Sequence, residues 1–191
     1  MLRDREPVPF RVSRRRFLRG VLMGVPAAVA LGGPGRALAS ALEDRSLEFI
    51  NTHTGETLKA AYFKAGSYCA DTLREFDHLL RDHRSGEVAH MDRGLFDLLH
   101  QVATLSGKDA RFEVISGYRS PATNAMLNAR SSGVAKRSLH MDGRAIDVRL
   151  AGYRTDRVRD LALSLKAGGV GFYRKSDFVH LDTGRVRTWG G

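Results

Sequence analysis

The N-terminal segment divides the chain and fixes how much of it can form a folded domain. Residues 1–39 hold eight arginines against two acidic residues, and positions 13–19 read SRRRFLR. A short apolar run over residues 21–31 and the small-x-small sequence Ala37-Leu38-Ala39 follow. This order is typical of a cleavable export signal, and paired arginines before Phe-Leu are typical of the twin-arginine signal. We therefore expect residues 1–39 to engage the twin-arginine export machinery and residues 40–191 to be a single periplasmic domain.

The formal net charge of +10 belongs mostly to this signal. Residues 40–191 carry only a small net positive charge, so we do not expect nucleic acid as a partner. The apolar run is about a dozen residues long and contains glycines and a proline, whereas a membrane-spanning helix needs about 20 apolar residues. We therefore expect no stable membrane anchor.

The chain has one cysteine, Cys69, so an internal disulfide is excluded and the domain depends on its core or on a metal for stability. A cysteine-dependent cross-linking enzyme of the same compartment would require a histidine and a glycine-rich turn beside Cys69. Its neighbours, Ser67-Tyr68-Cys69-Ala70, lack both. We interpret Cys69 as a small packed residue.

Apolar periodicity predicts an α+β domain. Alternating segments around Thr54-Gly55 predict a hairpin, and helical spacing predicts two helices with Asp71 and Asp92 as N-caps, the second ending at Ser106-Gly107. The pattern then predicts further elements: strands at 112–115, 144–150, 170–173 and 178–182, and helices at 121–129 and 155–166. We expect a small, mainly antiparallel sheet with helices packed on it.

Metal-binding residue types gather in two short segments, residues 138–147 and 177–182. Strand alternation places Asp147 opposite its aliphatic neighbours in the first segment, and it places His180 and Asp182 opposite theirs in the second. His140 enters from the loop before the first strand, where Gly143 permits a sharp turn. Two histidines and one carboxylate are the ligand set of a catalytic zinc site, because the fourth position stays open for water or substrate.

These motifs resemble the zinc D-Ala-D-Ala carboxypeptidase superfamily, with its hedgehog/DD-peptidase fold, and within it the exported murein endopeptidase K (YcbK-like) group. The resemblance rests on SxHxxGxAxD at residues 138–147 and FVHxD at residues 178–182. It is supported by ISGYRSPxxN at residues 115–124, GVGFY at residues 169–173 and TGxVxxW at residues 183–189. It covers the chain from about Leu47 to Trp189.

The resemblance implies zinc held by His140, Asp147 and His180, and hydrolysis of peptide bonds in peptidoglycan cross-links or stems. The activity would be that of an endopeptidase or a carboxypeptidase. A second hypothesis is a binding protein that keeps the fold and binds peptidoglycan without hydrolysing it. The intact ligand set argues against this alternative.

The sequence nominates two carboxylates as the general base. Asp177 precedes His180 by three residues, where carboxypeptidases of the superfamily carry a glutamate, but in a regular strand it faces the other side. Asp182 shares the face of His180 and could act on the water, on the ring of His180, or as a further ligand. The alternation of side chains along the strand slightly favours Asp182 as the general base.

Three residues are expected to bind substrate. Arg119 suits the carboxylates of stem peptides, because a guanidinium binds a carboxylate through two hydrogen bonds, and the resemblance places an arginine there. Tyr118 could polarise a carbonyl group or pack in the core, and packing is favoured. Ser138 is expected to donate a hydrogen bond near the metal rather than to act as a nucleophile.

Overall fold

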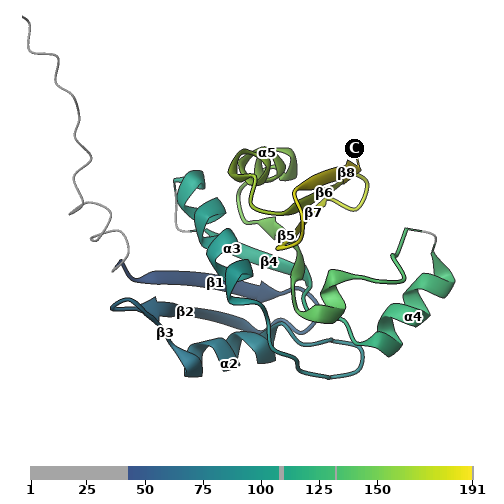
Figure 1. The fold of residues 1–191 in the computed structure, drawn as a ribbon, viewed down its shortest axis with the longest axis horizontal. Coiled ribbons are helices and arrows are strands. Elements are labelled where there is room, and N and C mark those ends of the chain that lie inside the picture. The colour runs from purple at the N-terminus through teal and green to yellow at the C-terminus, as the bar shows by residue number, and fades with distance from the viewer. Residues whose placement is uncertain (1–42, 108–109, 132, 191) are drawn as a thin grey trace, which may run out of the picture. The chain divides into compact units, whose positions relative to one another are not determined.

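The structure, a computed structural model, describes residues 43–107, 110–131 and 133–190 (Figure 1). The expected export signal and its cleavage site at Ala39 lie outside these residues. None of the helices in the described part of the chain is both long and apolar enough to span a membrane.

Eight strands form one mixed sheet in the order β3-β2-β1-β4-β5-β7-β6-β8. The pairs β1·β4 and β6·β8 are parallel, and the other neighbours are antiparallel. The strands are β1 Arg45–Asn51, β2 Thr57–Lys64, β3 Ser67–Tyr68, β4 Arg111–Ser116, β5 Ala145–Leu150, β6 Gly169–Tyr173, β7 Phe178–Asp182 and β8 Arg187–Gly190. The helices are α2 Ala70–Leu79, α3 Arg93–Ser106, α4 Pro121–Arg130, the short 3-10 helix η1 Leu139–Asp142 and α5 Thr155–Leu165.

The α+β class and the mainly antiparallel sheet are confirmed, but the expectation of a small sheet is wrong. Two edge strands were not predicted, because β3 has only two residues and β8 reads Arg-Thr-Trp-Gly without apolar alternation. β8 depends on a partner that is distant in sequence, because it lies parallel to β6, whereas β3 is the short return of a tight hairpin with β2. Tertiary pairing rather than local propensity therefore decides β8.

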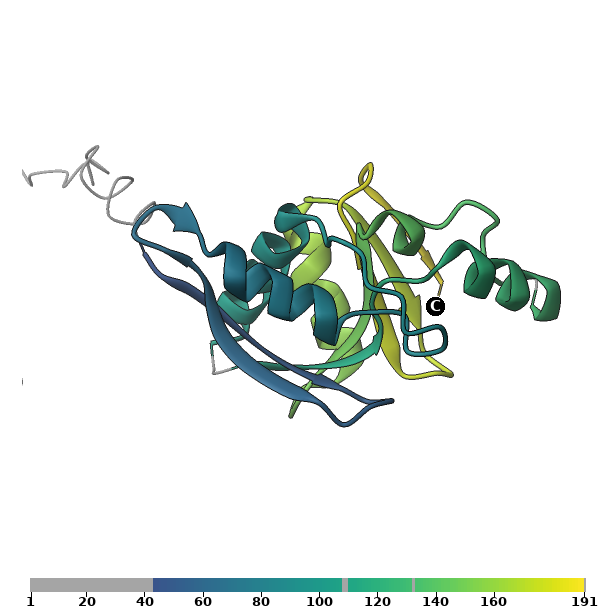
Figure 2. The same cartoon turned by 90° about the horizontal axis from the view of Figure 1, so that it is seen from below.

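One face of the sheet carries the core. Phe49, Phe112 and Leu150 lie side by side on β1, β4 and β5, and all three are fully or almost fully buried. Phe49 contacts the ring of Phe76 on α2 at 5.0 Å and that of Phe96 on α3 at 6.4 Å between centroids. Figure 2 shows α2, α3 and α5 in the hollow of the curved sheet and α4 outside it. At β5 and β7, the opposite face of the sheet is therefore not covered by α2, α3 or α5.

The helix ends follow the predicted chemistry with one exception. The Asp92 carboxylate accepts a hydrogen bond from the Gly94 amide at 2.9 Å, and Gly107 ends α3 in the left-handed conformation, so both predicted ends of α3 are confirmed. Asp71 is not the N-cap of α2, because the helix begins one residue earlier, with Cys69 at the cap position and Asp71 in the first turn. The same helix ends at Leu79. The buried Asp82 beyond it binds the backbone and hydroxyl of Ser120.

Candidate metal centre

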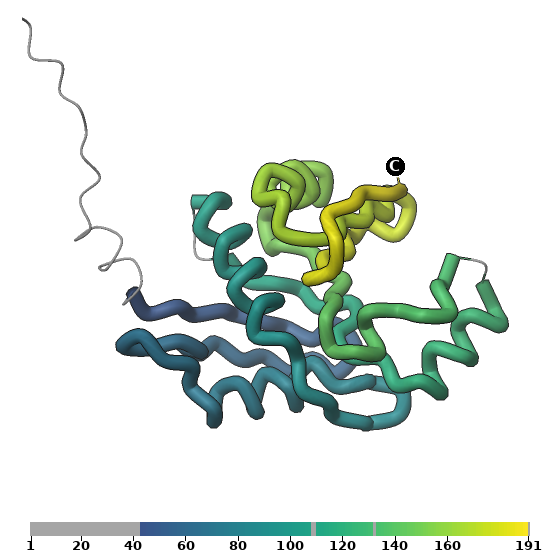
Figure 3. Tube along the Cα trace, in the orientation of Figure 1, coloured from purple at the N-terminus to yellow at the C-terminus, as the bar shows by residue number. Residues whose placement is uncertain are grey.

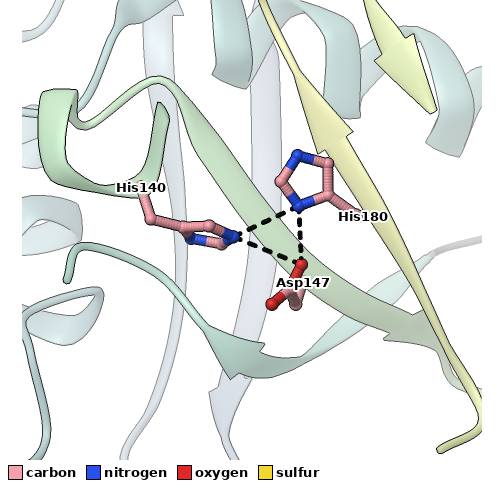
Figure 4. Close-up of side chains that lie close together, drawn as sticks. All are labelled: His140, Asp147 and His180. Atoms are coloured by element: carbon pink, nitrogen blue, oxygen red, sulfur yellow. Dashed lines mark hydrogen bonds and ion pairs between the residues drawn. The ribbon is translucent and has the colours of Figure 1, made fainter. Parts of the chain in front are cut away.

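Three side chains converge on the face of the sheet that the helices leave free. His140 Nε2 lies 3.2 Å from His180 Nδ1 and 3.3 Å from Asp147 Oδ1, and His180 Nδ1 lies 2.8 Å from the same oxygen (Figure 4). All three residues are buried. The residues that the sequence nominates as metal ligands are thus brought together, from a 3-10 helix and two neighbouring strands.

Strand register explains two of the three positions. Asp147 on β5 pairs directly with His180 on β7, so their side chains leave the sheet side by side. The same row continues to Ser116 on β4, Gly171 on β6 and Trp189 on β8. The metal-binding residue types therefore occupy the centre of one row that crosses five strands.

The third position depends on the turn around η1. Gly143 ends this helix with φ 66°, and a Cβ atom at this residue would lie 2.2 Å from the carbonyl oxygen of His90. The Gly143 carbonyl group accepts a hydrogen bond from the Asp92 amide at 2.9 Å. Only glycine combines this backbone conformation with this close approach. The turn holds His140 against the start of β5.

Each histidine has its second ring nitrogen fixed by a hydrogen bond. His140 donates from Nδ1 to the carbonyl oxygen of Gly117 at 2.7 Å, and His180 donates from Nε2 to Asp182 Oδ2 at 3.0 Å. With a metal bound, each ring would keep its proton on the nitrogen that faces these acceptors, so that His140 Nε2 and His180 Nδ1 would present lone pairs beside Asp147. The arrangement is that of oriented metal ligands.

The donor set fits zinc. Zinc–nitrogen and zinc–oxygen bonds of about 2.1 Å in tetrahedral geometry place neighbouring ligand atoms about 3.4 Å apart. The three observed separations lie between 2.8 and 3.3 Å, so an expansion of a few tenths of an ångström would accommodate the ion. Two nitrogen ligands and one oxygen ligand leave a fourth position open toward a cavity of about 370 Å³.

Electrostatics at the site favour the charged carboxylate. Burial alone would raise the pKa of Asp147, but the charge of His140 and the hydrogen bonds from His140 and His180 hold it well below its usual range. Burial would lower the pKa of His180, yet hydrogen bonds to Asp147 and Asp182 raise it to about 9. The site therefore attracts a cation, whether a proton or a metal ion.

Asp182 is fully buried behind the ring of His180 and has all its acceptor positions in use. Its carboxylate accepts hydrogen bonds from the amides of Gly169 and Gly184, from His180 Nε2, and from both Nη atoms of Arg187 at 2.9 and 2.7 Å. Burial would raise its pKa, but these donors hold the pKa far below its usual range. Of the three roles open to Asp182, this geometry favours the one on the ring of His180.

Asp177 does not join the cluster. β7 begins at Phe178, as an inward-turning loop would require, and Asp177 adopts φ 51°. Its carboxylate nevertheless accepts a hydrogen bond from the Thr155 hydroxyl at 2.7 Å and lies 3.5 Å from Arg149 Nε. These contacts tie the β6–β7 turn to the start of α5.

The expected substrate-binding residues separate into two groups. Arg119 and Ser138 line the cavity beside the metal ligands, and Arg119 Nη2 lies 3.8 Å from Asp147 Oδ2. Tyr118 is almost completely buried and donates its hydroxyl hydrogen to Glu87 at 2.9 Å, and it does not line the cavity. The packing role that the sequence favoured for Tyr118 matches this position.

An aromatic side chain closes one side of the ligand row. The Trp189 ring lies 5.1 Å from the His180 ring between centroids, and its Nε1 donates to Tyr173 Oη at 3.0 Å. A Cβ atom at Gly171 would lie 2.6 Å from Trp189, so the absence of a side chain at Gly171 lets the indole lie over β6. The indole shields one flank of the site from water.

Sequence reasoning missed two residues that hold the ligands. Arg187 neutralises Asp182, and the Gly117 carbonyl group holds the ring of His140. Arg187 follows Asp182 by five residues across a turn, and neither helical nor strand periodicity predicts a contact at this spacing. Gly117 lies in the ISGYRSPxxN motif of residues 115–124, but nothing in that motif indicates that its carbonyl oxygen contacts a histidine ring.

The sequence of the chain matches one family of known proteins over most of its length. The model of a family described as peptidoglycan L,D-endopeptidase MepK matches residues 39–189. The chain therefore belongs to this peptidase family, and the resemblance inferred from its motifs is confirmed.

Curated relatives agree over most of their length. The chain is 42% identical over 182 residues to peptidoglycan L,D-endopeptidase MepK of Escherichia coli strain K12, covering 94% of this chain and 98% of the relative. The protein of the same name from Shigella flexneri matches equally. The probable peptidoglycan L,D-endopeptidase MepK of Haemophilus influenzae is 45% identical over 156 residues, covering 81% of this chain and 84% of the relative.

Proposed function

We propose that the protein is an exported zinc peptidase that hydrolyses peptide bonds in peptidoglycan cross-links of the periplasm. The observation that carries the proposal is the convergence of His140 Nε2, His180 Nδ1 and Asp147 Oδ1 at the wall of a cavity. The relatives are named as peptidoglycan L,D-endopeptidases, which supports both the substrate and the reaction. The SRRRFLR sequence supports export by the twin-arginine machinery.

The name of the relatives also favours one bond among those open to the site. A cross-link from D-alanine to diaminopimelate joins two D centres, whereas a link between two diaminopimelate residues joins an L centre to a D centre. An L,D-endopeptidase of this family would therefore cut the second link. We propose the diaminopimelate–diaminopimelate bond as the substrate, in preference to the D-alanine link or a terminal D-alanine.

The residues of the site have distinct roles in this proposal. His140, Asp147 and His180 hold the metal, while the Gly117 carbonyl group and Asp182 keep the two rings in position. When bound, zinc lowers the pKa of its water to about 7 and stabilises the oxyanion that forms at the scissile carbonyl group. The remaining residues orient the substrate: Arg119 binds a carboxylate, Ser138 donates at the cavity rim, and Trp189 excludes water.

We assign Asp182 to positioning rather than to proton transfer. A general base needs a free lone pair within reach of the water, and every acceptor position of Asp182 is occupied. Asp177 is tied to Thr155 and Arg149. Both carboxylates that the sequence nominated thus support structure around His180, and Asp147 is the only carboxylate among the described residues that line the cavity.

One experiment distinguishes the proposed peptidase from the competing hypothesis of a peptidoglycan-binding protein without activity. Purified murein sacculi are incubated with the protein as isolated, after removal of zinc by a chelator, and after zinc is restored. The proposal predicts peptide release that is lost and regained with zinc, and mass analysis that identifies a cut between two diaminopimelate residues. Sacculi that remain intact while retaining the protein would instead support the binding protein.

A further inference from the structure

The cavity beside the metal ligands contains more positive charge than the ligands account for. Three arginines line it, Arg119, Arg137 and Arg187, against the single carboxylate of Asp147. Arg187 is fully engaged, because both of its Nη atoms bind Asp182. The cavity therefore offers two guanidinium groups for a ligand.

Arg119 is only weakly engaged by the protein. Its Nη atoms reach Asn124 Oδ1 and Ser116 Oγ at 3.4 Å each and Asp147 at 3.8 Å. Its buried Nε has no hydrogen-bond partner within the described structure. Because Arg119 lines the cavity and its contacts with the protein are long, its guanidinium group is suited to bind a substrate carboxylate.

Arg137 is the second group. It lines the cavity from the segment that joins α4 to η1, its side chain is exposed, and it makes no hydrogen bond or ion pair with any residue that the structure describes. Figures 1 and 3 show α4 and the following segment standing apart from α2, α3 and α5. The residues that line the cavity come from this segment on one side and from the strands on the other.

The backbone before Arg137 is held in place by a buried amide. Asn124, only 2% exposed, donates from Nδ2 to the carbonyl oxygens of Ala135 at 3.1 Å and Lys136 at 3.2 Å. Its Oδ1 accepts the hydrogen bond from Arg119. One buried side chain thus contacts Arg119 and holds the backbone that leads to Arg137. The backbone that presents Arg137 at the cavity is therefore anchored to the interior of the domain.

We propose that Arg137 is a specificity-determining residue that binds a second substrate carboxylate, so that Arg119 and Arg137 together select a cross-link with one free carboxylate on each side of the scissile bond. The inference rests on the proposed function. Diaminopimelate has two carboxyl groups. When two such residues are linked to each other, the acceptor keeps a carboxylate on the carbon that bears the scissile nitrogen, and the donor keeps one at the far end of its side chain. Amidation of these carboxylates removes the charge that a guanidinium recognises.

The test compares two substrates and three proteins. The substrates are the same cross-linked muropeptide with its diaminopimelate carboxylates free or amidated, and the proteins are the wild type, Arg137→Gln and the control Arg130→Gln. Arg130 is an exposed arginine at the end of α4 that does not line the cavity. We expect the wild type and Arg130→Gln to prefer the free acid about tenfold in kcat/KM. We expect Arg137→Gln to lose the part of this preference that Arg137 supplies, through a higher KM for the acid alone, while Arg119 maintains the rest.

The outcomes distinguish this inference from the function on which it rests. Arg137→Gln must retain zinc, since the residue is exposed and is not a ligand. If the wild type cleaves both substrates equally, or if Arg137→Gln keeps the wild-type preference, the role of Arg137 is wrong while the peptidase assignment stands. If the zinc-loaded wild type cleaves neither substrate, the proposed function itself fails. Arg137→Lys should restore part of the preference, because it restores the charge without the planar fork.

Discussion

At the scale of single residues, the two aspartates near His180 show how position along a strand differs from position in space. Asp182 is two residues from His180 and shares its face, yet its carboxylate is surrounded by five donors. Asp177 precedes the strand, and its carboxylate binds Thr155 and Arg149. Strand parity predicted the face of Asp182, but the hydrogen-bond partners that define its role come from the turn after β7, from the start of β8 and from the neighbouring strand β6, which alternation along β7 does not show.

The substitution Asp182→Asn tests the positioning role. It removes the charge that binds Arg187 and weakens the hydrogen bond that orients His180, so we expect zinc affinity to fall about 10- to 100-fold. Addition of excess zinc should restore a large part of the peptide release. The matched substitution Asp177→Asn should leave zinc affinity and turnover close to wild type. Full zinc affinity in Asp182→Asn combined with lost turnover would identify Asp182 as the general base instead.

The lowered pKa of the partly buried His83 gives a second prediction at this scale. The rings of His53 and His83 are stacked, with centroids 3.7 Å apart. Burial first, and then the charges of His53 and Arg84, lower the pKa of His83 from 6.5 to about 4. The unfolded chain therefore binds a proton that the folded chain does not in the window between these values. The free energy of unfolding must fall as the pH drops through it.

We expect His83 to account for a loss of about 1 kcal/mol between pH 6.5 and pH 4, after allowance for screening by solvent. His83→Phe retains a ring for stacking and cannot titrate. Denaturant unfolding over this pH range should therefore give a flatter curve for His83→Phe than for the wild type, while His78→Gln, an exposed control on α2, follows the wild type. Parallel curves for His83→Phe and the wild type would show that His83 does not contribute.

At the scale of the elements, the turn after η1 controls the position of His140. Gly143→Ala places a Cβ atom 2.2 Å from the His90 carbonyl oxygen, in a backbone conformation with φ 66°. Gly55 has a similar φ of 76° and no atom within 4 Å of the same added carbon, so it is a matched control. We expect Gly55→Ala to cost about 1 kcal/mol in the free energy of unfolding and Gly143→Ala about 3 kcal/mol or more.

Gly143→Ala should also lower zinc affinity, because the turn that carries His140 must move. The measurements are thermal or denaturant unfolding and zinc titration of both variants. Equal stability and equal zinc affinity in the two variants would contradict the account of this turn.

The elements also show what the sequence could and could not predict. Alternation within 144–150 and 178–182 is local, so it correctly placed Asp147 and His180 on faces away from their aliphatic neighbours. The pairing of Asp147 with His180 depends on strand order and register, which no local pattern contains. For the same reason β8 was missed, and with it the pairing that brings Trp189 over Gly171 and beside His180.

At the scale of the whole molecule, the distribution of charge separates export from catalysis. Most of the formal charge lies in residues 1–39, and we expect this segment to direct the folded protein to the periplasm. The substitution of Arg14 and Arg15 by lysine should keep the protein out of the periplasmic fraction, whereas substitution of Arg3 and Arg5 by lysine should not. Cell fractionation with immunodetection measures this, and periplasmic protein in both variants would contradict a twin-arginine signal.

The domain places its candidate site on the face of the sheet that is opposite to the core. The core face of the sheet holds the helices, and the opposite face holds one row of polar and small residues from β4 to β6 that ends at Trp189 on β8. A peptidase needs such a row to be rigid, since ligand atoms must stay close to metal-bonding distance. The buried core beneath β5 and β7 provides that rigidity.

The central claim is that His140 and His180 hold the zinc that hydrolysis requires. The most direct measurement determines zinc content and peptide release from sacculi for His140→Ala, His180→Ala and the control His78→Ala, an exposed histidine on α2. We predict that both site variants lose tightly bound zinc and peptide release together, while His78→Ala keeps both. Wild-type release by either site variant would contradict the account.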